Sequence, residues 1–283
     1  VDMVRPAAKY AALVERPDDV RYQLEKACAL ALEGRPGPVW LDIPQDVQMA
    51  EVDPGKLRPF PATELPPRPN GHAGRIPEIV ERLKAARRPL VIVGQGARLA
   101  GARELLEKTL PALGFPTLTT WNGLDLLGEE HPLYIGRSGV FGQYGANFAV
   151  ANADLILSLG SRLDTRQTGT RRASFAREAF KIAVDVSAPE LAKGLIDIQC
   201  PIHADVKDFL EALLPFLFGF QGVEIGGWLA RCREWKNRYP VTLPTYAGQK
   251  GSVNSYFFVD ALSGLMASGD TLVTDMGTSL TCT

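Results

Sequence analysis

The sequence is poor in cysteine and histidine and has no long apolar run, and each shortage excludes a class of protein. No two of its 4 cysteines form the CxxC pair of a zinc or redox site. The densest apolar stretch, residues 210–220, is interrupted by Glu211 and Pro215 and is too short to cross a bilayer. Lysine plus arginine (31) balance aspartate plus glutamate (32), so no basic surplus indicates a nucleic-acid partner. We expect a cytoplasmic protein with reduced thiols, no nucleic-acid partner and no membrane segment.

Two common kinds of enzyme site are also absent from the sequence. His72, His131 and His203 lie too far apart to suggest a metal centre or a catalytic triad. No serine lies in the G-x-S-x-G motif of the serine hydrolases. What the sequence does contain, 46% hydrophobic and 22% charged residues, is the composition of an ordinary globular protein.

Apolar strands alternate with amphipathic helices in the middle of the chain. The helices at residues 76–83 and 102–113 repeat apolar residues every three or four positions, and the last one begins at the capping residue Asp205. Continuous apolar strands are typical of parallel sheets with helices on both faces. The sequence therefore predicts an α/β fold, a doubly wound parallel sheet like those that bind nucleotides. Its strands are expected at residues 89–94, 117–119, 154–160 and 181–185.

Proline and glycine divide the chain into segments. Six prolines fall between residues 54 and 69, which predicts a stiff, extended linker. A second stretch rich in glycine and proline surrounds a polar helix at 228–238, and beyond it we expect a helix at 255–266 and a strand at 271–275. We predict a partial α/β domain, a proline-rich linker, a central domain, a second linker and the start of another α/β domain. Their boundaries are residues 1–52, 53–74, 75–216, 217–250 and 251–283.

Glycines and polar residues follow the predicted strands, where a parallel sheet has its ligand crevice. Glycines let backbone amides approach a phosphate, arginines pair with it, and an aspartate accepts hydrogen bonds from ribose hydroxyls. Together these residues suit a nucleotide. They are Gly94, Gln95, Gly96, Thr119, Thr120, Gly160, Arg162, Asp164, Arg166, Asp185 and Val186.

The same residues have simpler interpretations. The dinucleotide fingerprint G-x-G-x-x-G requires glycine at position 99, where Leu99 stands, so the glycines after the first strand are also consistent with a tight turn. The charged residues at 162–166 are also consistent with a hydrogen-bonded surface loop. Glycines at three-residue spacing in residues 136–145 disfavour a packing helix there. They predict either a loop that covers a ligand or a mobile surface loop.

One motif identifies the chain more specifically. Residues 34–48, Gly-Arg-Pro-Gly-Pro-Val-Trp-Leu-Asp-Ile-Pro-Gln-Asp-Val-Gln, closely resemble the end of the pyrimidine-binding domain of thiamine diphosphate-dependent enzymes of the acetolactate synthase type. The other motifs occur in the order typical of that family: Lys9 and Tyr10, then the proline linker, residues 160–169 and residues 273–277. The resemblance extends over essentially the whole chain.

The resemblance implies particular cofactors. In that family the central domain of the acetolactate synthases holds FAD, which the main reaction does not consume. Phe141 stands where those synthases usually carry histidine, which keeps open a central domain without FAD that acts as a spacer. For FAD the resemblance implies the strand-end residues together with Gly139, Val140 and Phe141, and for the diphosphate of thiamine diphosphate it implies Gly277, Thr278 and Ser279.

The resemblance also implies an activity. The intact enzyme would decarboxylate pyruvate or a similar 2-oxo acid and transfer the two-carbon unit to a carbonyl acceptor, as a homodimer or homotetramer. The family's catalytic glutamate would precede Val1 and its Mg²⁺ motif would follow Thr283, so no catalytic residue and no metal ligand is assigned here, and the chain alone is expected to be inactive. Three alternatives remain: a non-catalytic module that binds FAD or ADP, a thiamine diphosphate-dependent decarboxylase, and a sugar-modifying carboligase.

Overall fold

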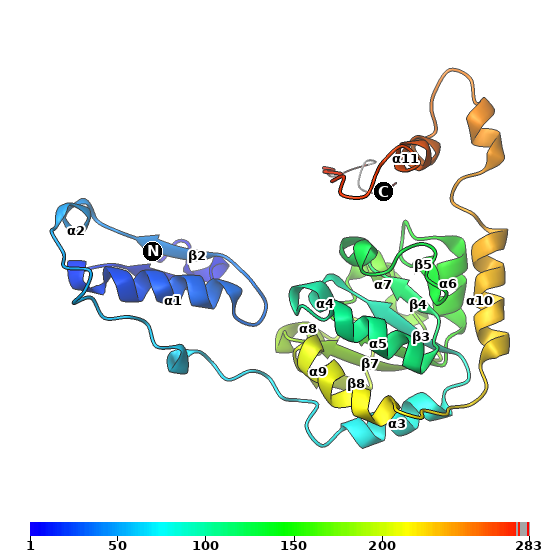
Figure 1. Cartoon of the computed structure of the whole chain (residues 1–283), viewed down its shortest axis with the longest axis horizontal. Coiled ribbons are helices and arrows are strands. Elements are labelled where there is room, and N and C mark those ends of the chain that lie inside the picture. The colour runs from blue at the N-terminus through cyan, green and yellow to red at the C-terminus, as the bar shows by residue number, and fades with distance from the viewer. Residues whose placement is uncertain (276, 278–281, 283) are drawn as a thin grey trace.

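A six-stranded parallel sheet forms the larger part of the structure, on the right in Figure 1. The computed structural model describes residues 1–275, 277 and 282. The strands lie in the order β5-β4-β3-β6-β7-β8, and every neighbouring pair is parallel. The predicted doubly wound α/β fold is confirmed. The strands are β3 (Pro89–Val93), β4 (Thr117–Thr119), β5 (Tyr134–Arg137), β6 (Leu155–Leu159), β7 (Phe180–Asp185) and β8 (Cys200–His203).

Helices cover both faces of the sheet because its strands are apolar on both sides. In β3, Val91 and Val93 belong to one core, Leu90 and Ile92 belong to the other, and all four are fully buried. The core around Val91 is closed by α3 (Ile76–Ala85), α4 (Gln95–Leu99), α5 (Arg103–Leu113) and α9 (Val206–Leu213). The core around Leu90 is closed by α6 (Tyr144–Asn152) and α10 (Gly226–Arg238).

The last of these helices, α10, lies within the predicted linker at residues 217–250. The polar helix expected there is confirmed, but it also packs on the sheet. Trp228 and Cys232 are buried against α6 and the strands, and the Trp228 indole N–H donates a hydrogen bond of 2.9 Å to the carbonyl oxygen of Pro89. Burial raises the pKa of the Cys232 thiol to about 12. A helix that looks polar in sequence therefore closes the second core with only one narrow face.

Two helix boundaries follow the signals in the sequence. The Asp205 carboxylate accepts a hydrogen bond of 2.7 Å from the backbone N–H of Lys207 and begins α9. Gly114 ends α5 in the left-handed conformation, with φ of 67°, and its N–H donates to the carbonyl oxygen of Leu110.

A small α/β unit precedes the sheet. Its two strands, β1 (Tyr10–Leu13) and β2 (Val39–Asp42), are parallel and are joined by α1 (Val20–Leu32), with α2 (Gln45–Met49) following. Figure 1 shows the proline-rich segment that follows as an extended connection to α3. Its single regular element is a 3₁₀ turn at Ala62–Glu64. Within the described part of the chain, no helix combines the length and apolarity needed to span a bilayer.

Two local predictions were wrong. Residues 136–145 are not one open loop, because β5 contains Gly136 and α6 contains Gly145. Both glycines serve close packing: a Cβ at Gly136 would lie 1.8 Å from Oε1 of Gln143, and one at Gly145 would lie 2.8 Å from the backbone of Trp235. Residues 271–275 are not a strand, and no strand of the described residues pairs with them. The helix before them, α11, is Ser255–Ser263.

Replacement of Gly114 by alanine tests the helix ending. We expect Gly114→Ala to lower the free energy of unfolding by about 1 kcal/mol, because an alanine side chain strains the left-handed backbone. Gly128→Ala is the matched control, since its Cβ also meets no atom within 4 Å but its φ is not positive. Urea unfolding followed by circular dichroism measures both. Equal effects of the two substitutions would contradict this explanation.

Candidate functional site

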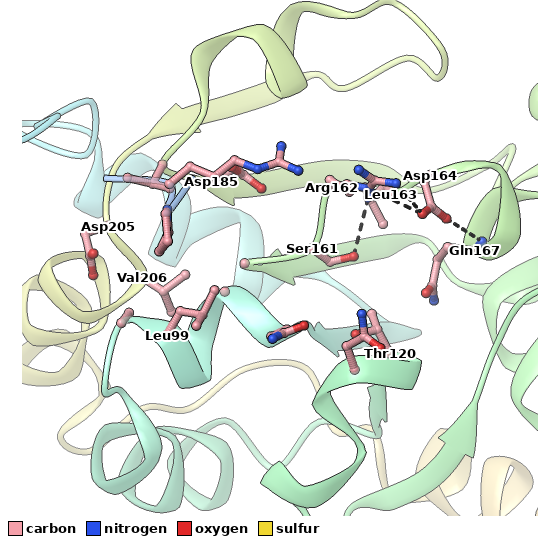
Figure 2. A pocket seen from close by; sticks show the side chains of 18 of the residues that line it. Leu99, Thr120, Ser161, Arg162, Leu163, Asp164, Gln167, Asp185, Asp205 and Val206 are labelled. Atoms are coloured by element: carbon pink, nitrogen blue, oxygen red, sulfur yellow. Dashed lines mark hydrogen bonds and ion pairs between the residues drawn. The ribbon is translucent and has the colours of Figure 1, made fainter. Parts of the chain in front are cut away.

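A cavity of about 590 Å³ lies beyond the carboxyl ends of β3, β4, β6 and β7. Strands β3 and β6 are neighbours whose following connections run to opposite sides of the sheet, which makes their ends the topological switch point. In Figure 2, Leu99 and Val206 line one side of the cavity, while Arg162, Asp164 and Gln167 line the other. Most of the predicted strand-end residues line this cavity: Gln95, Gly96, Thr120, Gly160, Arg162, Asp164, Arg166, Asp185 and Val186.

Glycine backbones meet directly at the floor of the cavity. A Cβ at Gly94 would lie 2.3 Å from the carbonyl oxygen of Gly160, and one at Gly96 would lie 2.7 Å from it. Gly160 has a φ of 64°, and a Cβ there would lie 2.6 Å from the backbone nitrogen of Ala97. The Gly96 N–H donates a hydrogen bond of 3.0 Å to the carbonyl oxygen of Gly160. These glycines therefore leave no side chain between the two turns.

The loop after β6 is held by its own aspartate. Asp164 caps the short helix α7 (Thr165–Thr168) by accepting hydrogen bonds from the backbone N–H groups of Arg166 (3.0 Å) and Gln167 (3.3 Å). Arg162 pairs with the same carboxylate at 3.1 Å. The simpler interpretation of this loop as a hydrogen-bonded network is therefore correct for Asp164. It does not describe Arg166, which lines the cavity and forms no ion pair among the described residues.

Leu163 anchors the same loop in the core. Its side chain is 2% exposed, and its φ of 47° is uncommon for a residue other than glycine. Such a conformation persists when the surrounding structure determines it. Burial of Leu163 therefore turns the neighbouring Arg162 and Asp164 toward the cavity (Figure 2).

Two carboxylates with shifted pKa values lie along β7 and α8 (Ala188–Ala192). Burial raises the pKa of the Asp185 carboxyl, although the Ser187 N–H, which donates to it at 2.8 Å, opposes this. Burial would also raise the pKa of Glu190, but hydrogen bonds from Lys193 and Arg35 outweigh it and hold that pKa below the usual range. Glu190 is thus ionised among cations, whereas at Asp185 burial outweighs the nearby charges of Arg35 and Lys193.

Arg35 is a site residue that strand-end reasoning missed. It lies in the loop between α1 and β2, lines the cavity together with Gly34 and Pro36, and pairs with Glu190 at 2.7 Å. The motif at residues 34–48 contains it, but in the sequence it is far from the sheet. The sequence does not show that Arg35 lies close to the strand ends, and only the folded structure does.

Several predicted residues lie outside the cavity. Gly94 lies beneath its floor and Thr119 is fully buried in β4. Gly139, Val140 and Phe141 form a loop beside α7, where the Val140 N–H donates to the carbonyl oxygen of Arg166 at 2.8 Å.

Asn147 holds this loop by hydrogen bonds of 2.9 and 3.0 Å to the N–H and C=O of Gly139. Phe141 is 59% exposed and meets Trp121, which lines the cavity, edge-on at 6.2 Å between ring centroids. The loop of Gly139, Val140 and Phe141 therefore lies at the rim of the cavity.

Two of the three predicted diphosphate residues lie outside the described part of the chain. Gly277 is described but does not line the cavity, and Thr278 and Ser279 lie outside the described residues. Within residues 1–275, 277 and 282, no group of three or more His, Cys, Asp and Glu side chains could hold a metal ion.

Comparison with known proteins shows the family of the chain. Residues 76–213 match the family described as thiamine pyrophosphate enzyme, central domain. The chain is 34% identical over 235 residues to the probable acetolactate synthase large subunit of Methanocaldococcus jannaschii, which covers 82% of this chain and 39% of that protein. The chain belongs to the thiamine diphosphate-dependent enzymes of the acetolactate synthase-like family.

Bacterial members of the family show the same similarity. The acetolactate synthase isozyme 3 large subunit of Escherichia coli is 32% identical over 257 residues, which are 87% of this chain and 44% of that protein. The large subunit of Corynebacterium glutamicum is 34% identical over 240 residues, 83% of this chain and 38% of that protein. The chain spans about two fifths of the length of these relatives.

The shifted pKa of Asp185 predicts a pH-dependent stability. Because its folded pKa is raised above 3.8, the native state holds the proton more tightly than the unfolded chain, and the stability this confers is lost as the pH rises through the folded pKa. We expect Asp185→Asn to raise the free energy of unfolding at neutral pH. The gain should vanish below the ordinary pKa of aspartate.

Urea unfolding across this pH range measures the effect. Asp18→Asn is the control, because its side chain is 75% exposed and should show no such gain. A gain for Asp185→Asn that is independent of pH would contradict the assignment.

Proposed function

We propose that the cavity at the switch point holds the adenine dinucleotide FAD, within an enzyme that decarboxylates pyruvate or a similar 2-oxo acid and transfers the two-carbon unit to a carbonyl acceptor. The observation that carries the first part is the contact of the Gly94 and Gly160 turns between β3 and β6. Numbered from β3, the strand order is 3-2-1-4-5-6, the order in which dinucleotides bind at the switch point. The reaction itself is proposed from relatives named acetolactate synthases.

The residues around the cavity fit such a ligand. Its volume of about 590 Å³ lies within the range of small-molecule and cofactor pockets. The glycine floor would let a pyrophosphate approach the backbone, and Arg35, Arg162 and Arg166 line the same space with their positive charge. Asp185, at the end of β7, supplies a carboxylate that a ribose hydroxyl can bind.

Each part of the chain has a separate role in this proposal. Arg162 and Arg166 bind the pyrophosphate, Asp185 orients the ribose, and Phe141 with Trp121 shields the rim from water. Thiamine diphosphate, when bound with Mg²⁺, supplies the nucleophilic carbon for the reaction of the 2-oxo acid. Its diphosphate contacts are proposed at Gly277, Thr278 and Ser279, and no catalytic residue or metal ligand is assigned in this chain.

The assembly and the alternatives follow from the same relatives. Their names as large subunits support a multisubunit enzyme, and we propose a homodimer or homotetramer. A non-catalytic module that binds FAD or ADP is a second candidate, favoured by a cavity that residues 76–213 line apart from Gly34, Arg35 and Pro36, and by the exposed Phe141 at its rim. A decarboxylase or a sugar-modifying carboligase would use the same nucleotide site.

Flavin binding tests the nucleotide site. We expect FAD fluorescence to change saturably on titration with the chain, and Gly160→Ala to weaken binding at least about tenfold, because its Cβ would push the two turns apart. Gly194→Ala is the matched control, since Gly194 has a similar φ of 65° but nothing within 4 Å of its Cβ. If neither FAD nor ADP binds the wild-type chain, the site is refuted; if ADP binds and FAD does not, the ADP module is the correct assignment.

The reaction is tested separately with the intact protein. Supplied with thiamine diphosphate, Mg²⁺ and pyruvate, it is expected to form acetolactate, identified by NMR. Acetaldehyde as the product would assign a decarboxylase, and a branched product formed only with a keto sugar would assign a sugar-modifying carboligase. No consumption of pyruvate or another 2-oxo acid under these conditions would refute the proposed chemistry.

A further inference from the structure

A second cavity, of about 590 Å³, lies away from the switch point. It lies between the edge strand β5 with α6, the end of α10 and one side of α11. Its polar lining includes Arg137, Gln143, Lys236, Tyr256 and Asp260. None of these residues lines the nucleotide cavity.

Arg137 is held in position at this cavity by its backbone. Its N–H donates a hydrogen bond of 2.9 Å to Oε1 of Gln143, and its carbonyl oxygen accepts one of 2.8 Å from the Gln143 N–H. Gly136 makes this clamp possible, because a Cβ there would collide with Oε1 of Gln143. The Arg137 guanidinium lies 5.9 Å from the centre of the Trp121 ring, so its side chain is oriented as well.

The charges around the cavity are not all compensated. The Lys236 ammonium lies 2.8 Å from the Glu129 carboxylate and donates to the carbonyl oxygens of Glu129 (3.0 Å) and Tyr134 (3.3 Å), so it is satisfied. Among the residues that the structure describes, Arg137 forms no ion pair and its guanidinium donates no hydrogen bond. The Asp260 carboxylate, across the cavity on α11, likewise has no cationic partner in the described chain.

This arrangement suits one class of ligand. A guanidinium presents a rigid fork of N–H donors that matches a carboxylate bidentately. A cation that lacks a partner, is fixed by a backbone clamp and lines a concave site is therefore preorganised for an anion of that shape. Asp260 would repel a second negative charge and attract an ammonium group on the same ligand.

We propose that the second cavity binds a small organic carboxylate through Arg137. The carboxylate accepts two hydrogen bonds from the guanidinium, and the rest of a short carbon chain extends toward Tyr256 and Asp260 on α11. Two sources share this chemistry: a 2-oxo acid, and an α-amino acid whose ammonium group faces Asp260. The proposal does not rest on the nucleotide site, because the two cavities have different lining residues.

Calorimetric titration of the chain with pyruvate and with L-alanine tests the proposal. These probes share a carboxylate and a methyl group, and they differ in the oxo or ammonium group between them. We expect saturable binding of at least one probe, and Arg137→Met should weaken it at least about tenfold, because the charge-assisted pair is lost. Arg137→Lys should restore part of the affinity.

Control variants distinguish a loss of ligand binding from a loss of folding, and they show whether the ligand is a 2-oxo acid or an amino acid. Arg171→Met removes an exposed arginine that does not line the cavity and should bind as the wild type does. Circular dichroism and thermal unfolding confirm that each variant is folded. If L-alanine binds and Asp260→Asn weakens its binding, the ligand is assigned as an amino acid; if only pyruvate binds and Asp260→Asn leaves its affinity unchanged, the ligand is assigned as a 2-oxo acid.

Two results would overturn the proposal: no saturable binding of either probe to the wild-type chain, or equal affinities for the wild type and a folded Arg137→Met. Loss of FAD binding in Gly160→Ala would not change the expected binding of pyruvate or alanine. The proposals for the two cavities can therefore be refuted independently.

Discussion

The ligand crevice depends on one close approach, in which the backbone turn after β3 rests directly on the turn after β6. Gly94, Gly96 and Gly160 allow it because any side chain at these positions would overlap backbone atoms. The two turns meet where the sheet changes its winding direction, so the floor of the cavity is made of peptide groups. The N–H groups of Gly94, Gly96 and Gly160 are used in hydrogen bonds within the protein, so the charge that suits a phosphate comes from the arginines that line the cavity. The position of the crevice follows from the topology.

The charges at the two cavities are organised differently. At the switch-point cavity the Glu190 carboxylate pairs with Arg35 and Lys193, so their positive charge is held in place but partly neutralised. At the second cavity Arg137 is held by backbone and ring contacts and keeps its charge. A ligand that binds Arg35 or Arg162 must therefore compete with a carboxylate of the protein, whereas a ligand that binds Arg137 meets no such competing carboxylate among the described residues.

The sequence predicts what is local and continuous. The apolar run of β3 and the capping Asp205 are visible without a structure, because each depends on neighbouring residues. Strand β5 and helix α6 were missed, because glycines that serve close packing look in sequence like glycines of a loop. Arg35 was missed as a site residue for another reason. It pairs with Glu190, which is more than a hundred positions away in the chain, and the periodicity of a sequence does not reveal contacts between such distant residues.

The ion pair between Arg35 and Glu190 has a consequence for how the small β1–β2 unit meets the sheet. The Arg35 side chain is 49% exposed, so its attraction to Glu190 is screened by dissolved ions, unlike a contact between apolar surfaces. High ionic strength therefore weakens the attraction that this ion pair contributes between the unit and the cavity. Through Arg35, the lining of the switch-point cavity joins two parts of the chain by a contact whose strength depends on the salt concentration.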